Sequence, residues 1–173
     1  TQLRTKPHRI YGAEGLRKIL EDFNATGDYK LFDQPFPLEI IEIETLEKFE
    51  ILRGVEAVGI KTPHTDESHA IHLRESDKTL VYSADTGMTM VLGDAAKGVG
   101  LFVCECSFVK NKPVESHIEL AEAMHLARFA KPKKMLLTHF YPEWDEIDFA
   151  KEIEKFTPMC EVIEAVDGLR IDF

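Results

Sequence analysis

Four segments of the chain read as apolar strands that end abruptly in short polar loops, and this feature constrains the fold more than any other. The loops are HTDES (64–68), ADTG (84–87), ECSF (105–108) and THFYP (138–142). Polar residues placed at the ends of buried strands are a common way to build a site on a rigid frame. The sharpest question concerns Asp85, because a carboxylate after a buried strand either caps a turn or holds something positive.

The segments around these loops predict a sheet covered by helices. Strands come first along the chain and then alternate with helices, which favours an α/β fold over a helix bundle or an all-β sandwich. Gly98 is expected to end the second helix, and Ser116 to cap the third, with Glu119 completing a capping box. Helices are predicted at 13–23, 90–98, 116–130 and 144–156, strands at 38–44, 55–62, 100–108, 133–140, 160–168 and 169–173, and a hairpin at 68–73 and 78–84.

Composition narrows the class of protein. The 173 residues, 44% of them hydrophobic, suffice for one domain with a core, and no apolar run approaches the ~18 residues that span a bilayer. The start of the chain lacks the layout of a signal peptide. The cysteines are Cys104, Cys106 and Cys160, a sparse, odd count that argues against a disulfide scaffold and favours a reducing cytoplasm. The net charge of −10 disfavours passive attraction to nucleic acid.

Three of the strand-end loops carry residue types that bind metals, namely His64, Asp85 and His139. An imidazole offers a neutral nitrogen and a carboxylate can bridge two cations, so the set suits zinc, manganese or iron. Each residue also has a simpler interpretation. Asp85 could cap a turn or helix, His139 could be a hydrogen-bonded core histidine, and His64 could belong to an ordinary loop.

Other candidates are weaker. Cys104 and Cys106 face the same way along one strand, and we interpret them as buried apolar residues rather than half of a zinc site. Glu105 points to the opposite face of that strand. His117 is expected to begin the helix at 116–130, where it either contacts a substrate oxygen or is simply solvated.

Five segments, taken in order, resemble late motifs of the metallo-β-lactamase superfamily, especially its ribonuclease Z-like branch. They are PHTDESHAIHL, KTLVYSADTG, ECSF, SHIELAEAM and KKMLLTHFYP, and PHRIYGAEGLRKIL resembles an earlier strand and helix of that family. The resemblance implies that His64, Asp85 and His139 are metal ligands, with Asp85 as the bridge. It also implies that His117 is a catalytic residue that assists near the scissile phosphate.

The family's first ligand motif, His-x-His-x-Asp-His, does not occur in these residues. We therefore expect residues 1–173 to form a single metallo-β-lactamase-like domain, an αββα sandwich that is N-terminally incomplete. Its metal site is then also incomplete, and the chain alone is expected to be inactive. The expected partner is the missing N-terminal segment or a second copy of the chain, which would cover an exposed sheet edge and apolar face.

The function implied is that of a metal-dependent hydrolase, in which two divalent metal ions activate a hydroxide that attacks a phosphodiester. Zinc is the expected metal, with manganese or iron as alternatives. Only twenty residues separate His64 from Asp85, too few for the tRNA-gripping arm of ribonuclease Z, so a small phosphodiester or nucleotide-like substrate is favoured and nucleic acid stays open. The competing hypotheses are a non-catalytic fragment or degenerate domain that binds a partner, and a thioester or lactone hydrolase of the same superfamily.

Overall fold

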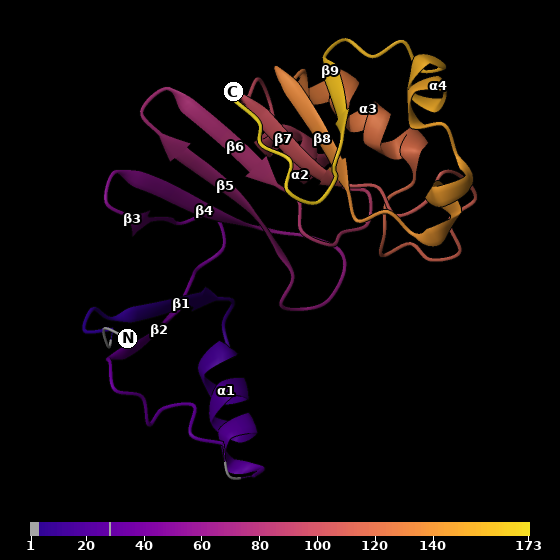
Figure 1. The fold of residues 1–173 in the computed structure, drawn as a ribbon. Coiled ribbons are helices and arrows are strands. Elements are labelled where there is room, and N and C mark those ends of the chain that lie inside the picture. The colour runs from indigo at the N-terminus through magenta and orange to yellow at the C-terminus, as the bar shows by residue number, and fades with distance from the viewer. Residues whose placement is uncertain (1–3, 28) are drawn as a thin grey trace. The chain divides into compact units, whose positions relative to one another are not determined.

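The computed structural model describes residues 4–27 and 29–173, which form two compact units. The first unit ends at Glu47 and contains a parallel pair of strands, β1 (His8–Gly12) and β2 (Leu38–Glu42), with helix α1 (Leu16–Ala25) between them in sequence (Figure 1). The predicted helix and strand are therefore confirmed here. The apolar stripe of α1 is not buried, since Ile19 and Phe23 are both at least half exposed.

The second unit, Lys48–Phe173, is built on a seven-stranded sheet in the order β3-β4-β5-β6-β7-β8-β9. The pairs from β3 to β6 are antiparallel, and those from β6 to β9 are parallel. The strands are β3 (Lys48–Leu52), β4 (Val55–Lys61), β5 (His69–Glu75), β6 (Lys78–Tyr82), β7 (Leu101–Glu105), β8 (Lys134–Thr138) and β9 (Glu161–Glu164).

The direction of the strands explains why the polar loops meet. Strand β5 is antiparallel to both β4 and β6, so β4 runs in the same direction as β6, β7 and β8. The carboxyl ends of these four strands therefore lie at one edge of the sheet, where ligand sites of parallel sheets are usually found. The four polar loops predicted from the sequence follow these four ends.

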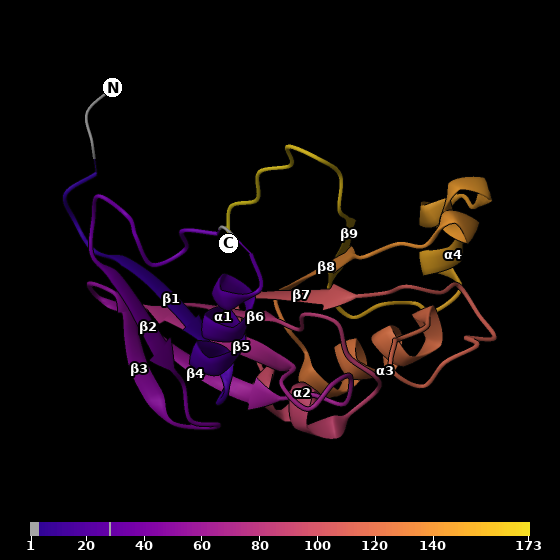
Figure 2. The ribbon, with the colours of Figure 1, turned by 90° about the horizontal axis from the view of Figure 1, so that it is seen from below.

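The core lies between one face of this sheet and helices α2 (Met90–Ala95) and α3 (Leu120–Ala130), which lie together on that face (Figure 2). Val81, Phe102 and Met135 are paired across β6, β7 and β8 and are fully buried there. On the opposite face, the paired residues Tyr82, Val103, Leu136 and Ile163 form an apolar row that is only half-buried or exposed.

Three predictions about local structure are wrong. Helix α3 begins at Leu120 rather than near Ser116, and its capping box is formed by Glu119 and Glu122. The cause is an extended segment before the helix, in which the amide of Phe108 donates to the carbonyl of Ile118 and the amide of Leu120 donates to the carbonyl of Phe108. These bonds hold residues 117–119 out of the helix.

The predicted helix at 144–156 is two pieces, a 3₁₀ turn η1 (Pro142–Glu146) and helix α4 (Phe149–Glu154). Asp148 caps α4 through its side chain and so restarts the helix at that point. Residues 169–173 form no strand, and β3 is a strand that periodicity did not reveal. Within the described residues, no helix has the length and apolar character needed to cross a membrane.

Candidate metal centre

The carboxyl edge of the sheet brings Asp85 and His139 into contact. Asp85 follows β6 and His139 follows β8, and Oδ1 of Asp85 lies 3.5 Å from Nε2 of His139. Both side chains keep access to solvent, with 43% and 35% exposed respectively. His139 also has a left-handed backbone (φ 61°), which is uncommon for a residue with a Cβ and marks the sharp turn after β8.

His64, in the loop after β4, lies at the same carboxyl edge and packs against His117. Its Nδ1 lies 3.0 Å from the carbonyl oxygen of Ser116, and its ring centroid lies 4.9 Å from that of His117. A carbonyl oxygen can only accept, so Nδ1 of His64 carries a proton, and in the neutral ring Nε2 keeps its lone pair.

His117 lies between the other two histidines, and it is buried rather than solvated. Its ring stacks on that of His139 at a centroid distance of 5.3 Å, and only 7% of the residue is exposed. Because the extended segment precedes α3, His117 does not occupy the helix N-terminus expected from the sequence. Its Nδ1 lies 3.0 Å from Oε1 of Glu105, at the end of β7, and its Nε2 lies 3.5 Å from the hydroxyl of Tyr141.

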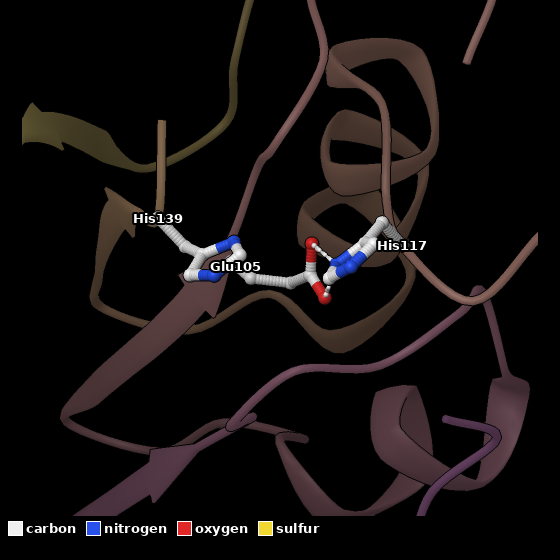
Figure 3. A group of neighbouring side chains, drawn as sticks. All are labelled: Glu105, His117 and His139. Carbon is white, nitrogen blue, oxygen red and sulfur yellow. Dashed lines mark hydrogen bonds and ion pairs between the residues drawn. The ribbon is translucent and has the colours of Figure 1, made fainter. Parts of the chain in front are cut away.

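Glu105 is the residue that sequence reasoning undervalued. Its side chain is 1% exposed, and its two oxygens accept from the amides of Thr86 and Ile118 and the hydroxyl of Ser107. They also accept from Nδ1 of His117 (Figure 3). A carboxylate offers about four acceptor positions, and all four are used here. A charged residue within an apolar strand was the available signal, since such residues are almost never fully buried unless they are paired.

Glu105, His117 and His139 place ligand atoms within 4.8 Å of one another, a spacing that alone would allow a cation. The hydrogen bonds argue otherwise, because Glu105 has no lone pair left to offer. Glu105 instead holds the ring of His117 through its Nδ1, and the donor atoms that remain are Nε2 of the histidines and the carboxylate of Asp85.

The strand that ends in Asp-Thr-Gly can now be explained. Asp85 reaches His139, Thr86 is buried with its amide on Glu105, and the amide of Gly87 donates to the carbonyl of Pro63 at 2.8 Å. A Cβ on Gly87 would lie 2.2 Å from the carbonyl oxygen of Glu115, so only glycine fits. The three residues join the loops after β4, β6 and β7.

The cysteines play no part in this site. Cys104 and Cys106 are fully buried free thiols, and burial raises the pKa of each well above its ordinary value. They lie against the helical core, in agreement with their interpretation as apolar residues.

Comparison with known proteins identifies the family. The family described as "Beta-lactamase superfamily domain" matches residues 1–140. The chain belongs to this superfamily. Over 84 residues, or 47% of the chain, it is 36% identical to the uncharacterized protein ML1173 of Mycobacterium leprae, and the alignment covers 29% of that relative.

Solved structures of the superfamily show the same fold. The metallo-beta-lactamase fold protein YhfI from Bacillus subtilis matches with a TM-score of 0.73 at 21% identity, over 94% of this chain and 64% of YhfI. The short form of human tRNase Z matches with a TM-score of 0.68 at 16% identity, over 98% of this chain and 69% of that one. The resemblance read from the sequence is therefore confirmed, and the chain spans about two thirds of the length of these structures.

The superfamily fold implies divalent metal binding, and the donor set at the carboxyl edge fits it. Zinc binds nitrogen and oxygen at about 2.0–2.2 Å, so two neighbouring ligands of a tetrahedral ion lie roughly 3.3–3.5 Å apart. The separation of Asp85 and His139 matches this value. A metal cation bound between an imidazole nitrogen and a carboxylate oxygen at such a distance would be stabilised by both atoms.

Proposed function

We propose that this β-lactamase superfamily member is a metal-dependent phosphodiesterase. The observation that carries the proposal is the meeting of three histidines and one aspartate at the carboxyl edge of the sheet. Asp85 lies beside His139, and His117 lies within ring-to-ring contact of both His64 and His139. We assign metal ligation to His64, Asp85 and His139, with Asp85 as the bridging carboxylate.

Two divalent ions bound there would supply Lewis acidity and an activated water molecule, and zinc suits the nitrogen and oxygen donors best. These three residues offer too few donors for two closed coordination shells. Further ligands would therefore come from the His-x-His-x-Asp-His motif of the family, and residues 1–173 alone are expected to be inactive.

His117 is assigned to the leaving group rather than to the metal. Glu105 accepts from its Nδ1 at 3.0 Å and so fixes the ring, while Nε2 faces the hydroxyl of Tyr141 at 3.5 Å. A protonated Nε2 can donate to the departing oxygen, and the buried carboxylate beneath stabilises the cation that donates.

A small substrate is favoured over a folded RNA. An open pocket of about 670 Å³, a volume typical of small-molecule sites, is lined by His64 together with Lys61, Thr65 and Thr89, but not by the other proposed site residues. The chain between His64 and Asp85 is taken up by one loop and the β5–β6 hairpin, which leaves no arm for tRNA. The net charge of −10 also disfavours a polyanionic substrate.

Three free thiols are consistent with our placing the protein in the cytoplasm.

The test uses the protein at its natural length, with bis-p-nitrophenyl phosphate as substrate and a thioester and a lactone as comparison substrates. We expect stoichiometric zinc, manganese or iron and hydrolysis of the phosphodiester. Asp85→Asn should lose both metal and activity, whereas His117→Ala should keep the metal and lose at least about 10²-fold in kcat. The matched control is His125→Ala, since His125 is exposed on α3 away from the site.

Three results would overturn the assignment. Absence of stoichiometric metal would leave a non-catalytic binding domain. Hydrolysis of the thioester or lactone without the phosphodiester would identify another hydrolase of the superfamily. Full activity in His117→Ala would remove that residue from the mechanism.

A further inference from the structure

Ser107 lies at the point where the buried carboxylate and His139 come closest. It follows β7, it is fully buried, and its hydroxyl oxygen lies 2.7 Å from Oε2 of Glu105 and 2.8 Å from Nδ1 of His139. A third, longer contact of 3.3 Å reaches Nδ1 of His117. Neither the family resemblance nor the ligand assignment gives this serine a role.

Counting protons decides how these bonds run. Glu105 accepts from all four of its neighbours, so the single hydroxyl proton of Ser107 points to Oε2 of Glu105. The Ser107 oxygen then faces Nδ1 of His139 with a lone pair. A 2.8 Å contact between them requires a proton, and that proton must belong to the imidazole.

The reverse arrangement fails on the same count. If Ser107 donated to His139, its oxygen would face Oε2 of Glu105 at 2.7 Å with no hydrogen between two acceptors. A buried lone pair set against a carboxylate costs a hydrogen bond and adds repulsion. Nδ1 of His117 cannot supply the hydrogen that would be missing between the Ser107 oxygen and Oε2 of Glu105, because it already donates to Glu105.

We propose that Ser107 is a positioning residue that keeps a proton on Nδ1 of His139 and so directs Nε2 toward Asp85. The buried carboxylate of Glu105 thereby fixes two imidazoles, His117 directly and His139 through the serine hydroxyl. With His64 held by the carbonyl of Ser116, all three histidines present Nε2 at the carboxyl edge. Outer partners of this kind set the tautomer of metal-binding histidines in many proteins.

The proton position itself can be measured without metal, whereas its consequence for metal binding rests on the proposed function. The experiment records long-range ¹H–¹⁵N NMR spectra of the histidine rings at about pH 8 in the 173-residue chain. Protonated and bare imidazole nitrogens have widely separated ¹⁵N shifts, so the state of Nδ1 in His139 is read directly. The exposed His125 serves as the internal reference.

We expect Nδ1 of His139 to be protonated in the wild type and in Ser107→Thr, which keeps the hydroxyl. In Ser107→Ala the acceptor is lost, Nε2–H can donate to Asp85 instead, and Nδ1 should become bare. A bare Nδ1 in the wild type, or an unchanged Nδ1 in a folded Ser107→Ala, would overturn the proposal. The wild-type spectrum alone is decisive if the alanine variant does not fold.

The metal experiment separates this inference from the proposed function. In the natural-length protein, Ser107→Ala should weaken metal affinity about 10–100-fold, and Ser107→Thr should restore it. If the wild type binds no metal while Nδ1 of His139 is protonated, the function is wrong and the role of Ser107 stands. If the wild type binds metal and Ser107→Ala leaves both affinity and tautomer unchanged, the function stands and the role of Ser107 is wrong.

Discussion

Gly87 is the residue whose replacement should test the geometry of the site most severely. A Cβ there would lie 2.2 Å from the carbonyl oxygen of Glu115 and 3.1 Å from that of Pro63. Ordinary contact begins at 3.4 Å, so one of these backbones must move by more than about 1 Å in Gly87→Ala. Asp85 lies two residues before Gly87 and His117 two residues after Glu115, so that movement separates the proposed ligand from the proposed acid.

The cost can be worked from the same distances. Overpacking against backbone costs about 1–3 kcal/mol, and straining the bond from the Gly87 amide to Pro63 adds about 1 kcal/mol. The alanine also restricts the unfolded chain, which returns about 0.4–1 kcal/mol. We therefore expect Gly87→Ala to lower the free energy of unfolding by about 1–4 kcal/mol. A displacement of about 1 Å in an active site can cost about 10²-fold in rate.

Urea unfolding and amide hydrogen exchange measure the two effects separately. The Thr86 amide, which donates to Glu105, should lose protection in Gly87→Ala because the loops part. Gly98→Ala is the matched control. Gly98 has φ 65° and nothing within 4 Å of an added Cβ, so it should lose about 1–2 kcal/mol from backbone strain and leave Thr86 protected. Equal stability of the two variants together with unchanged Thr86 exchange would refute the reasoning.

Three further predictions follow from buried groups. Glu105→Gln should lower the free energy of unfolding by about 2–5 kcal/mol in a urea titration. The reason is that an amide nitrogen in place of Oε2 would leave the Ser107 hydroxyl and the Ile118 amide without an acceptor. The control Glu154→Gln, at an exposed position, should change little. A native thiol titration should detect Cys160 before Cys104 and Cys106, whose pKa values burial raises well above normal, and fast modification of all three would contradict their burial. Burial lowers the pKa of His72 below its ordinary 6.5, so the unfolded state binds the extra proton and stability should fall as the pH drops below about 6.5. That dependence should weaken in His72→Gln, and an identical pH profile for the variant would show that another group is responsible.

The sequence was enough to predict that His64, Asp85 and His139, the candidate ligands, follow strand ends at one edge of the sheet. Apolar strands followed by His64, Asp85 and His139 indicate three strand ends, and the fold places those ends together because the strands run in one direction. Periodicity could not reveal how His117 is held. Residues 116–130 carry a helical pattern, but backbone bonds to Phe108 draw the first of them into an extended segment. Such a tertiary contact overrides local propensity and leaves no trace in the spacing of apolar residues.

The prediction of one continuous helix over residues 144–156 was wrong for a different reason. Its apolar residues repeat correctly on both sides of Asp148, but an aspartate is a strong N-cap and its side chain accepts from the amide of Lys151. The cap overrides the periodicity at this residue because it satisfies an amide that would otherwise lack a partner.

The buried carboxylate of Glu105 gives the site its order, and the reason is electrostatic. A carboxylate that is 1% exposed is costly to bury unless each lone pair receives a hydrogen. The four donors come from the loop after β6, the loop after β7 and the segment before α3, so satisfying the charge fixes three chain segments at once. Two of those donors lead to imidazoles, directly at His117 and through Ser107 at His139. The same bonds that make Glu105 tolerable in the core therefore engage Nδ1 of both rings and leave Nε2, which is the atom that the proposed metal ion at His139 and the proposed leaving group at His117 need.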